Sequence, residues 1–152
     1  MNIYFAGSIT GGRDFEKYQH KIVYILKSFG HKVLSEHVSN FELQKKFRAK
    51  ATKSGKFFKY ISGHDKKLIY KADAIVAECS QGSLGTGFEI CYGAYVLKIP
   101  VICLRFEKAP GIASSTIFGD DSKLIRAFLY NDKNLEEILQ KALKSSIKGG
   151  RR

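Results

Sequence analysis

Residues 72–89 read ADAIVAECSQGSLGTGFE and carry the strongest signal of fold class in the chain. The run from Ala72 to Glu78 is largely apolar, which is typical of a strand that is buried on both faces of a parallel sheet. A Gly-rich turn from Gln81 to Gly87 follows, and a helix is expected through Glu89. Because a strand, a tight turn and a helix form the repeating unit of α/β proteins, the stretch predicts that class.

The rest of the chain repeats this alternation. We predict helices over 15–29, 57–70, 89–97 and 132–143, an irregular basic segment over 41–60, and strands over 3–7, 32–35, 72–78, 99–104 and 124–130. With right-handed crossovers, the simplest doubly wound arrangement is a five-stranded parallel sheet in the order 2-1-3-4-5, flavodoxin-like or Rossmann-like. We expect a single domain over residues 1–145 and a flexible basic tail over 146–152. Ligands should bind at the carboxyl ends of strands 1 and 3.

The composition limits which classes of protein this chain can belong to. The chain has 152 residues, of which 44% are apolar and 26% are charged, as expected for one globular domain. No apolar run approaches the ~18 residues that span a bilayer, and no signal peptide is recognisable, so we expect a cytoplasmic protein without membrane contact. Cys79, Cys91 and Cys103 lie in apolar stretches and are odd in number, which favours buried, reduced thiols over disulfides or a zinc site.

The net charge of +12 is concentrated in two segments. Residues 41–60 hold seven basic groups and one acidic group, and residues 141–152 hold five basic groups and no acidic group. Solvated basic segments are one interpretation. The other is a field that attracts phosphate substrates or nucleic acid.

Two Gly-rich loops are predicted at the carboxyl edge of the sheet. Residues 7–13 follow the first strand and residues 80–89 follow the third. Small residues before a helix let backbone N–H groups approach an anion, although such turns are also purely structural. Glu89 falls in the first helical turn, where a carboxylate either complements the helix dipole or serves chemistry.

Other polar side chains converge on the same edge. Asp65 lies on the helix before the third strand, and His37 follows the second strand. Each alone is an ordinary surface residue. Together with Glu89 they supply two carboxylates, the minimum set for cleaving a glycosidic bond with retention. No spacing of His, Cys and Asp indicates a metal site, so we expect neither metal nor cofactor.

Several motifs in order resemble one family. They are IYFAGSI with GGR (3–9 and 11–13), LSEHV (34–38), ADAIVAE (72–78), SLGTGFE (83–89) and SSTIFG (114–119). In these the chain resembles the nucleoside 2-deoxyribosyltransferase superfamily. It is most similar to the branch of 2'-deoxynucleoside 5'-phosphate N-hydrolases (Rcl-type), over roughly residues 2–130.

The resemblance implies three catalytic residues. Glu89 matches the nucleophile that attacks the anomeric carbon. Asp65 matches the acidic residue that assists it, either as an acid/base or by orienting it. Tyr4 matches a tyrosine beside the sugar and the nucleophile.

The resemblance also implies a binding set. His37 lies near the base, and Ser114 reaches the phosphate from the neighbouring subunit of a homodimer. The rest of the implied set surrounds the substrate and its 5'-phosphate: Gly7, Ser8, Ile9, Gly11, Gly12, Arg13, Ser83 and Gly85. The chain departs from the pattern at Thr10, where relatives carry Arg, and at Gly82, where Pro is usual.

The implied activity is hydrolysis of 2'-deoxyribonucleoside 5'-monophosphates to the base and 2-deoxyribose 5-phosphate through a covalent glutamyl intermediate. One alternative is a deoxyribosyltransferase, in which a second base replaces water; its usual acidic residue is absent at Ser83. Another is a non-enzymatic binder of nucleotides or nucleic acid through the basic segments. The sequence leaves the preferred base open.

Overall fold

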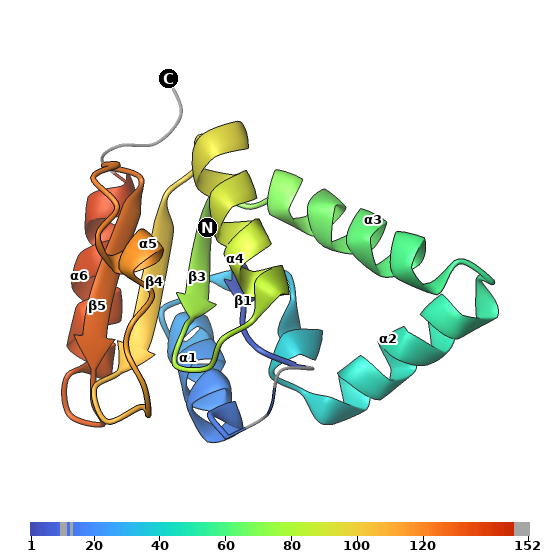
Figure 1. Cartoon of the computed structure of the whole chain (residues 1–152), viewed down its shortest axis with the longest axis horizontal. Helices are drawn as coiled ribbons and strands as arrows, with labels where there is room; N and C mark the ends of the chain where they lie inside the picture. The colour runs from blue at the N-terminus through green and yellow to red at the C-terminus, as the bar shows by residue number, and fades with distance from the viewer. Residues whose placement is uncertain (10–11, 13, 148–152) are drawn as a thin grey trace.

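The computed structural model describes residues 1–9, 12 and 14–147. Its core is one sheet of five parallel strands in the order β2-β1-β3-β4-β5, as predicted (Figure 1). The strands are β1 (Asn2–Ala6), β2 (Lys32–Val33), β3 (Ala74–Glu78), β4 (Val101–Phe106) and β5 (Ile125–Tyr130). The sheet order confirms the doubly wound α/β class.

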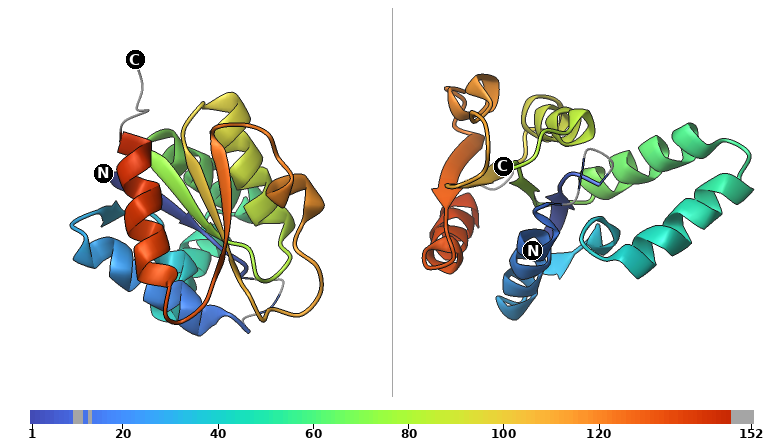
Figure 2. Two further views of the ribbon diagram at one scale, coloured as in Figure 1. Left: turned by 90° about the vertical axis from the view of Figure 1, so that its left-hand side faces the viewer. Right: turned by 60° about the horizontal axis from the view of Figure 1, so that its bottom comes forward.

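Helices cover both faces of the sheet (Figure 2). One apolar core lies beneath α1 and α6, and the other lies beneath α4 and the end of α3. Alternate strand residues feed the two cores, so Phe5 faces α1 whereas Tyr4 faces α4. The helices are α1 (Glu16–Ser28), α2 (Phe41–Lys53), α3 (Phe57–Tyr70), α4 (Leu84–Cys91), α5 (Ser115–Phe118) and α6 (Leu135–Ile147).

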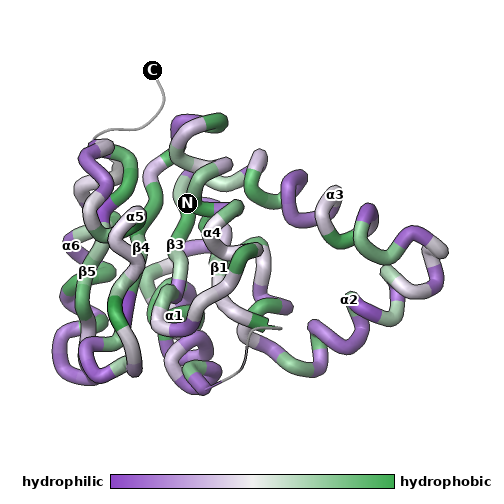
Figure 3. The backbone as a smooth tube through the Cα atoms, viewed as in Figure 1, coloured by the Kyte–Doolittle hydropathy of each residue, from purple (hydrophilic) through white to green (hydrophobic). Residues whose placement is uncertain are grey.

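The segment over 41–60 is helical, so the prediction of an irregular segment was wrong. Asn40 caps α2 by accepting a hydrogen bond from the Leu43 amide at 3.1 Å. The many basic side chains leave this helix largely hydrophilic (Figure 3). With α3 it forms a hairpin that extends away from the sheet (Figure 1), and the Phe47 ring closes the hairpin against Tyr60 and His64.

The Gly-rich turn after β3 is shorter than predicted. The Ser83 hydroxyl accepts a hydrogen bond from the Thr86 amide at 3.3 Å and caps α4, which begins at Leu84. Gly85 and Gly87 therefore lie inside the helix. After Cys91 the helix continues as a π-helical turn over Tyr92–Val96.

The prediction of three buried thiols was partly wrong. Cys103 is buried in β4 and Cys79 is half-buried, but Cys91 is exposed at the end of α4, on a helix with only one buried face. Within the described residues, no helix has the length and apolarity to cross a membrane. Residues 148–152 of the expected tail lie outside the described part of the chain.

Candidate active site

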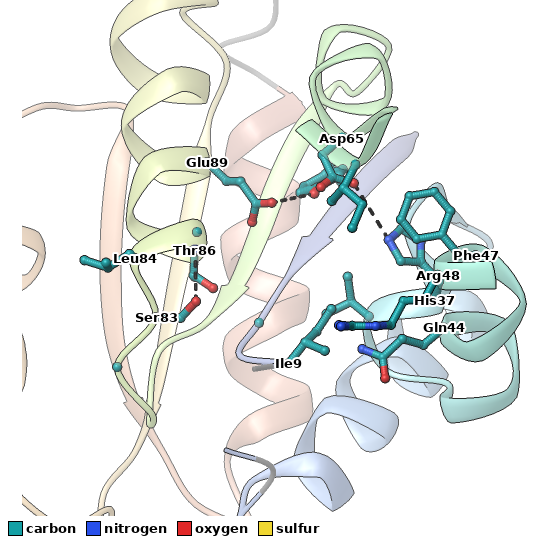
Figure 4. A pocket seen from close by; sticks show the side chains of 16 residues that line it. Ile9, His37, Gln44, Phe47, Arg48, Asp65, Ser83, Leu84, Thr86 and Glu89 are labelled. Atoms are coloured by element: carbon teal, nitrogen blue, oxygen red, sulfur yellow. Dashed lines mark hydrogen bonds and ion pairs between the residues drawn. The ribbon is translucent and has the colours of Figure 1, made fainter. Parts of the chain in front are cut away.

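A cavity of about 460 Å³ opens at the carboxyl ends of β1 and β3, between α4 and the α2–α3 hairpin (Figure 4). This is the edge at which doubly wound sheets bind ligands. Its lining residues are Tyr4, Gly7, Ile9, His37, Val38, Gln44, Phe47, Arg48, Ile61, Asp65, Gly82, Ser83, Leu84, Gly85, Thr86 and Glu89.

A hydrogen bond between Tyr4 and Glu89 occupies the base of the cavity. The Tyr4 hydroxyl, on β1, donates to Oε1 of Glu89, on α4, at 2.8 Å. Tyr4 is 1% exposed, so its ring is fixed in the core while its hydroxyl reaches the cavity. The bond holds one oxygen of the Glu89 carboxyl in a defined place.

The pKa of the Glu89 carboxyl lies near neutral pH. Burial raises its pKa, the hydrogen bond from Tyr4 lowers it, and the negative charge of Asp65 raises it again, with a net pKa of about 7. Burial, followed by the charges of Glu89 and Asp65, raises the pKa of the Tyr4 hydroxyl far above its usual range. Tyr4 therefore stays protonated and donates to Glu89 throughout the physiological range.

Asp65 enters the cavity from α3. Burial raises its pKa to about 6, and within the described chain its Oδ1 atom has no hydrogen-bond partner. Its contact with Nε2 of His37, at 3.8 Å, is longer than a hydrogen bond (Figure 4). A buried carboxyl oxygen without a hydrogen bond is suited to receive or give a proton when a ligand binds.

His37 is held at the cavity by its neighbours in sequence. The Ser35 hydroxyl accepts from the Phe5 amide at 2.8 Å and donates to the Phe5 carbonyl at 2.7 Å, which fixes the loop to the end of β1. Burial, followed by the nearby His64, lowers the pKa of His37 to about 4. The imidazole is therefore neutral at pH 7.

The beginning of α4 forms the opposite wall. Ser83, Leu84, Gly85 and Thr86 line the cavity, so the unpaired N–H groups of the first helical turn lie beside it. The Thr86 hydroxyl oxygen is buried and has no hydrogen-bond partner among the described residues. A helix start with nearby hydroxyls is suited to bind a phosphate.

The structure brings most of the predicted site residues to this cavity, but not all. Ser8 is buried beside it, and its hydroxyl has no hydrogen-bond partner in the described part of the chain. Gly12 lies outside the lining; it has φ 124°, and a Cβ atom there would collide with the Gln81 amide. Ser114 is exposed and does not line the cavity of its own chain. The predicted residues Gly11 and Arg13, together with Thr10, lie outside the described residues.

Sequence reasoning missed the wall that α2 supplies. Gln44, Phe47 and Arg48 line the cavity from this helix, and Ile61 joins them from α3. A signal was present, because Asn40 is a good N-cap residue and Gln44, Phe47, Arg48 and Ala51 follow helical spacing. The many lysines in this segment concealed the helical spacing.

The arrangement combines an oriented carboxyl whose pKa is near neutral, a second carboxyl and a helix start that faces the cavity. Such a set can attack an electrophilic carbon, exchange a proton with a leaving group and hold a phosphate.

Comparisons with known proteins agree with this chemistry. Residues 3–125 match the family described as nucleoside 2-deoxyribosyltransferase. A protein of Methanosarcina mazei named "Putative 2'-deoxynucleoside 5'-phosphate N-hydrolase 1" is 39% identical over 140 residues, covering 91% of this chain and 81% of the relative. The 5-hydroxymethyl-dUMP N-hydrolases of Mus musculus and Esox lucius are each 33% identical, covering 98% and 97% of this chain and 83% and 99% of the relatives. The chain belongs to the nucleoside 2-deoxyribosyltransferase family.

Proposed function

We propose that this protein hydrolyses the N-glycosidic bond of 2'-deoxyribonucleoside 5'-monophosphates and releases the free base and 2-deoxyribose 5-phosphate. The observation that carries the proposal is the Tyr4–Glu89 hydrogen bond at the base of a cavity whose opposite wall is a helix start. The names of the N-hydrolase relatives support the same reaction.

Glu89 is the proposed nucleophile. Its carboxylate oxygen forms a bond to C1' of the sugar while the C1'–N bond breaks and the base leaves with the electron pair. A water molecule then adds to C1' of the glycosyl ester, and the Glu89 carboxylate is released. The proton of that water passes to a carboxylate that acts as general base or to solvent. The Tyr4 hydroxyl orients the attacking carboxylate and holds it until the bond forms.

Asp65 is the proposed partner in proton transfer. Burial raises its pKa to about 6, so at neutral pH it exchanges a proton at small cost. In its protonated form it can donate to the leaving base, and in its ionised form it can accept the proton of the attacking water.

The 5'-phosphate is proposed to bind at the start of α4. Ser83 caps the helix and lines the cavity, so its side chain lies where a dianion would sit. Hydrogen bonds to a charged group contribute about 1.5–3 kcal/mol each. We expect kcat/KM for a monophosphate to exceed that for the matching nucleoside by at least about a hundredfold, or roughly 2.7 kcal/mol.

The variants Ser83→Asp and Ser83→Asn test this placement. Both residues are good N-caps, so both proteins should fold, but only Asp brings a negative charge. Ser83→Asp should reverse the preference for the monophosphate, and Ser83→Asn should largely retain it. Chromatography of base release with and without an acceptor base supplies the measurement. Equal cleavage of nucleosides and monophosphates by the wild-type protein, or exchange onto the acceptor, would favour a transferase instead.

A homodimer with shared sites is part of the proposal. Leu84 and Ile112 are 98% and 93% exposed, and Phe88, one helical turn after Leu84, is 51% exposed. Leu84 adjoins the cavity, while Ile112 lies two residues before the exposed Ser114. Apolar side chains at both places are suited to an isologous contact that brings Ser114 of one protomer to the phosphate end of the partner's cavity.

A further inference from the structure

The wall of the cavity that lies opposite α4 carries one permanent positive charge. Among the described lining residues, Arg48 is the only Arg or Lys, and it extends from α2 beside Gln44 (Figure 4). The other basic side chain of the lining, His37, has its pKa lowered to about 4 by burial. Among the residues that the structure describes, the cavity therefore offers a ligand one guanidinium at neutral pH, that of Arg48.

Arg48 is positioned by an aromatic ring. Its guanidinium carbon lies 5.4 Å from the centre of the Phe57 ring, at the beginning of α3. This distance is within the range of a cation–π contact, which restrains a side chain that is otherwise exposed. The guanidinium is thus held at the cavity by the hairpin itself.

The proposed binding mode, on which this inference rests, determines what Arg48 meets. With the phosphate at the start of α4 and C1' at Glu89, the base extends toward α2 and α3. Phe47 and Ile61 offer apolar surface to the faces of a planar ring there, and Arg48 and Gln44 offer polar groups to its edge.

A guanidinium group distinguishes hydrogen-bond acceptors from donors on the edge of a base. It has five N–H donors and no acceptor, so it pairs with carbonyl oxygens and ring nitrogens but not with exocyclic amino groups. We propose that Arg48 contacts the edge of the leaving base and makes this enzyme select bases that carry a carbonyl at that edge over those that carry an amino group. The preferred substrates are then monophosphates of guanine, hypoxanthine, thymine or uracil, and adenine and cytosine are disfavoured.

Two matched pairs of substrates test the proposal. 2'-Deoxyinosine and 2'-deoxyadenosine 5'-monophosphates differ only at the C6 edge of the base, and dUMP and dCMP differ only at the C4 edge. For each, kcat/KM is compared between the wild type and Arg48→Met, so that the intrinsic lability of each bond cancels. Lys45→Met removes the same charge from the same helix at a residue outside the cavity lining and is the control.

We expect Arg48→Met to lower kcat/KM about tenfold for both carbonyl substrates and less than twofold for both amino substrates, since the loss of one hydrogen bond from a charged donor to a carbonyl oxygen has an effect of this order. Lys45→Met should change none of them beyond twofold. Arg48→Lys should lose most of the selectivity between the two purine substrates, because it keeps the charge but not the planar pair of donors that can meet O6 and N7 together. Circular dichroism checks that each variant is folded.

Results that contradict the role of Arg48 can be distinguished from results that contradict the proposed hydrolase. Equal losses on all four substrates, restored by Arg48→Lys, would mean that Arg48 attracts the phosphate, and no loss on any of them would mean that it does not touch the substrate. Either outcome overturns the inference and leaves the proposed hydrolase intact. If the wild-type protein cleaves none of the four monophosphates, the proposed function fails and the inference fails with it.

Discussion

Two neighbours act on the Glu89 carboxyl in opposite directions. Burial raises the pKa most, the hydrogen bond from Tyr4 favours the ionised form, and the negative charge of Asp65 favours the protonated form, with a net pKa of about 7. The proposed nucleophile must be ionised to attack, so on this proposal the two contacts set the pH at which the enzyme becomes active. The two carboxyls interact, so the apparent pKa values belong to the pair.

The first prediction follows from these signs. Because the proposed nucleophile Glu89 must lose its proton, the rising limb of the kcat/KM profile should have its midpoint near pH 7, and ionisation of the proposed proton donor Asp65 should lower kcat/KM at higher pH. Tyr4→Phe should move this midpoint to higher pH, and Asp65→Asn should move it to lower pH, each by about half a unit to one unit. pH–rate profiles from 5 to 9 give the midpoints. Shifts in the same direction would mean that the rising limb does not report Glu89.

At the scale of single elements, α2 shapes one wall of the cavity and carries none of the proposed catalytic residues. It contributes Phe47 and Arg48 to one wall, whereas Glu89 and Tyr4 come from α4 and β1. Its beginning depends on the Asn40 cap. Loss of an N-cap costs about 1 kcal/mol of helix stability.

Asn40→Ala should therefore raise KM several-fold and leave kcat nearly unchanged. Asn40→Ser restores a capping oxygen and should behave like the wild type. Steady-state kinetics and hydrogen exchange of the amides in the first turn of α2 measure the two effects. A fall in kcat at constant KM would contradict this account, because it would place α2 in the chemical step.

What the sequence predicted and what it missed have a common physical basis. The strands were predictable because buried parallel strands are continuous apolar runs, as in Ala74–Glu78. The helix α2 was missed because it buries only a narrow face, at Gln44 and Ala51, and its other positions are rich in lysine. Consequently Arg48 and Phe47 were absent from the predicted site, while Tyr4, Asp65 and Glu89 were brought together as expected.

At the scale of the whole molecule, the positive charge of the 41–60 segment lies on the α2–α3 hairpin that extends from the sheet (Figure 1). A basic arm beside a nucleotide-sized cavity raises the local concentration of phosphate substrates. Nucleic acid would be attracted by the same field, with an affinity that falls steeply with salt.

A further prediction concerns assembly. If the exposed apolar side chains of Leu84, Phe88 and Ile112 join two copies, Ile112→Asp should convert the dimer to a monomer and reduce activity, because Ser114 no longer reaches the partner's cavity. Tyr24→Asp, at a 74% exposed residue of α1, is a control away from these three residues. Light scattering during gel filtration gives the mass of each variant. A fully active wild-type monomer at micromolar concentration would rule out shared sites.

The thermal stability of the Glu89→Gln protein shows whether the variant is folded. The folded-state pKa of Glu89 is raised to about 7 from an ordinary value of 4.5, so the stability gained from its protonated form is complete below pH 4.5 and is lost as the pH rises through 7. The neutral amide that this substitution introduces mimics the protonated carboxyl. The variant should therefore melt at or above the wild-type temperature at pH 8.

Release of the base from a deoxyribonucleoside 5'-monophosphate by wild-type and Glu89→Gln protein is the most direct test of the account. Chromatography should show the free base and 2-deoxyribose 5-phosphate in equal amounts with the wild type. Glu89→Gln should be slower by several orders of magnitude, as expected for loss of a covalent nucleophile. Near-normal turnover by a folded Glu89→Gln protein, or no base release by the wild type, would contradict the account.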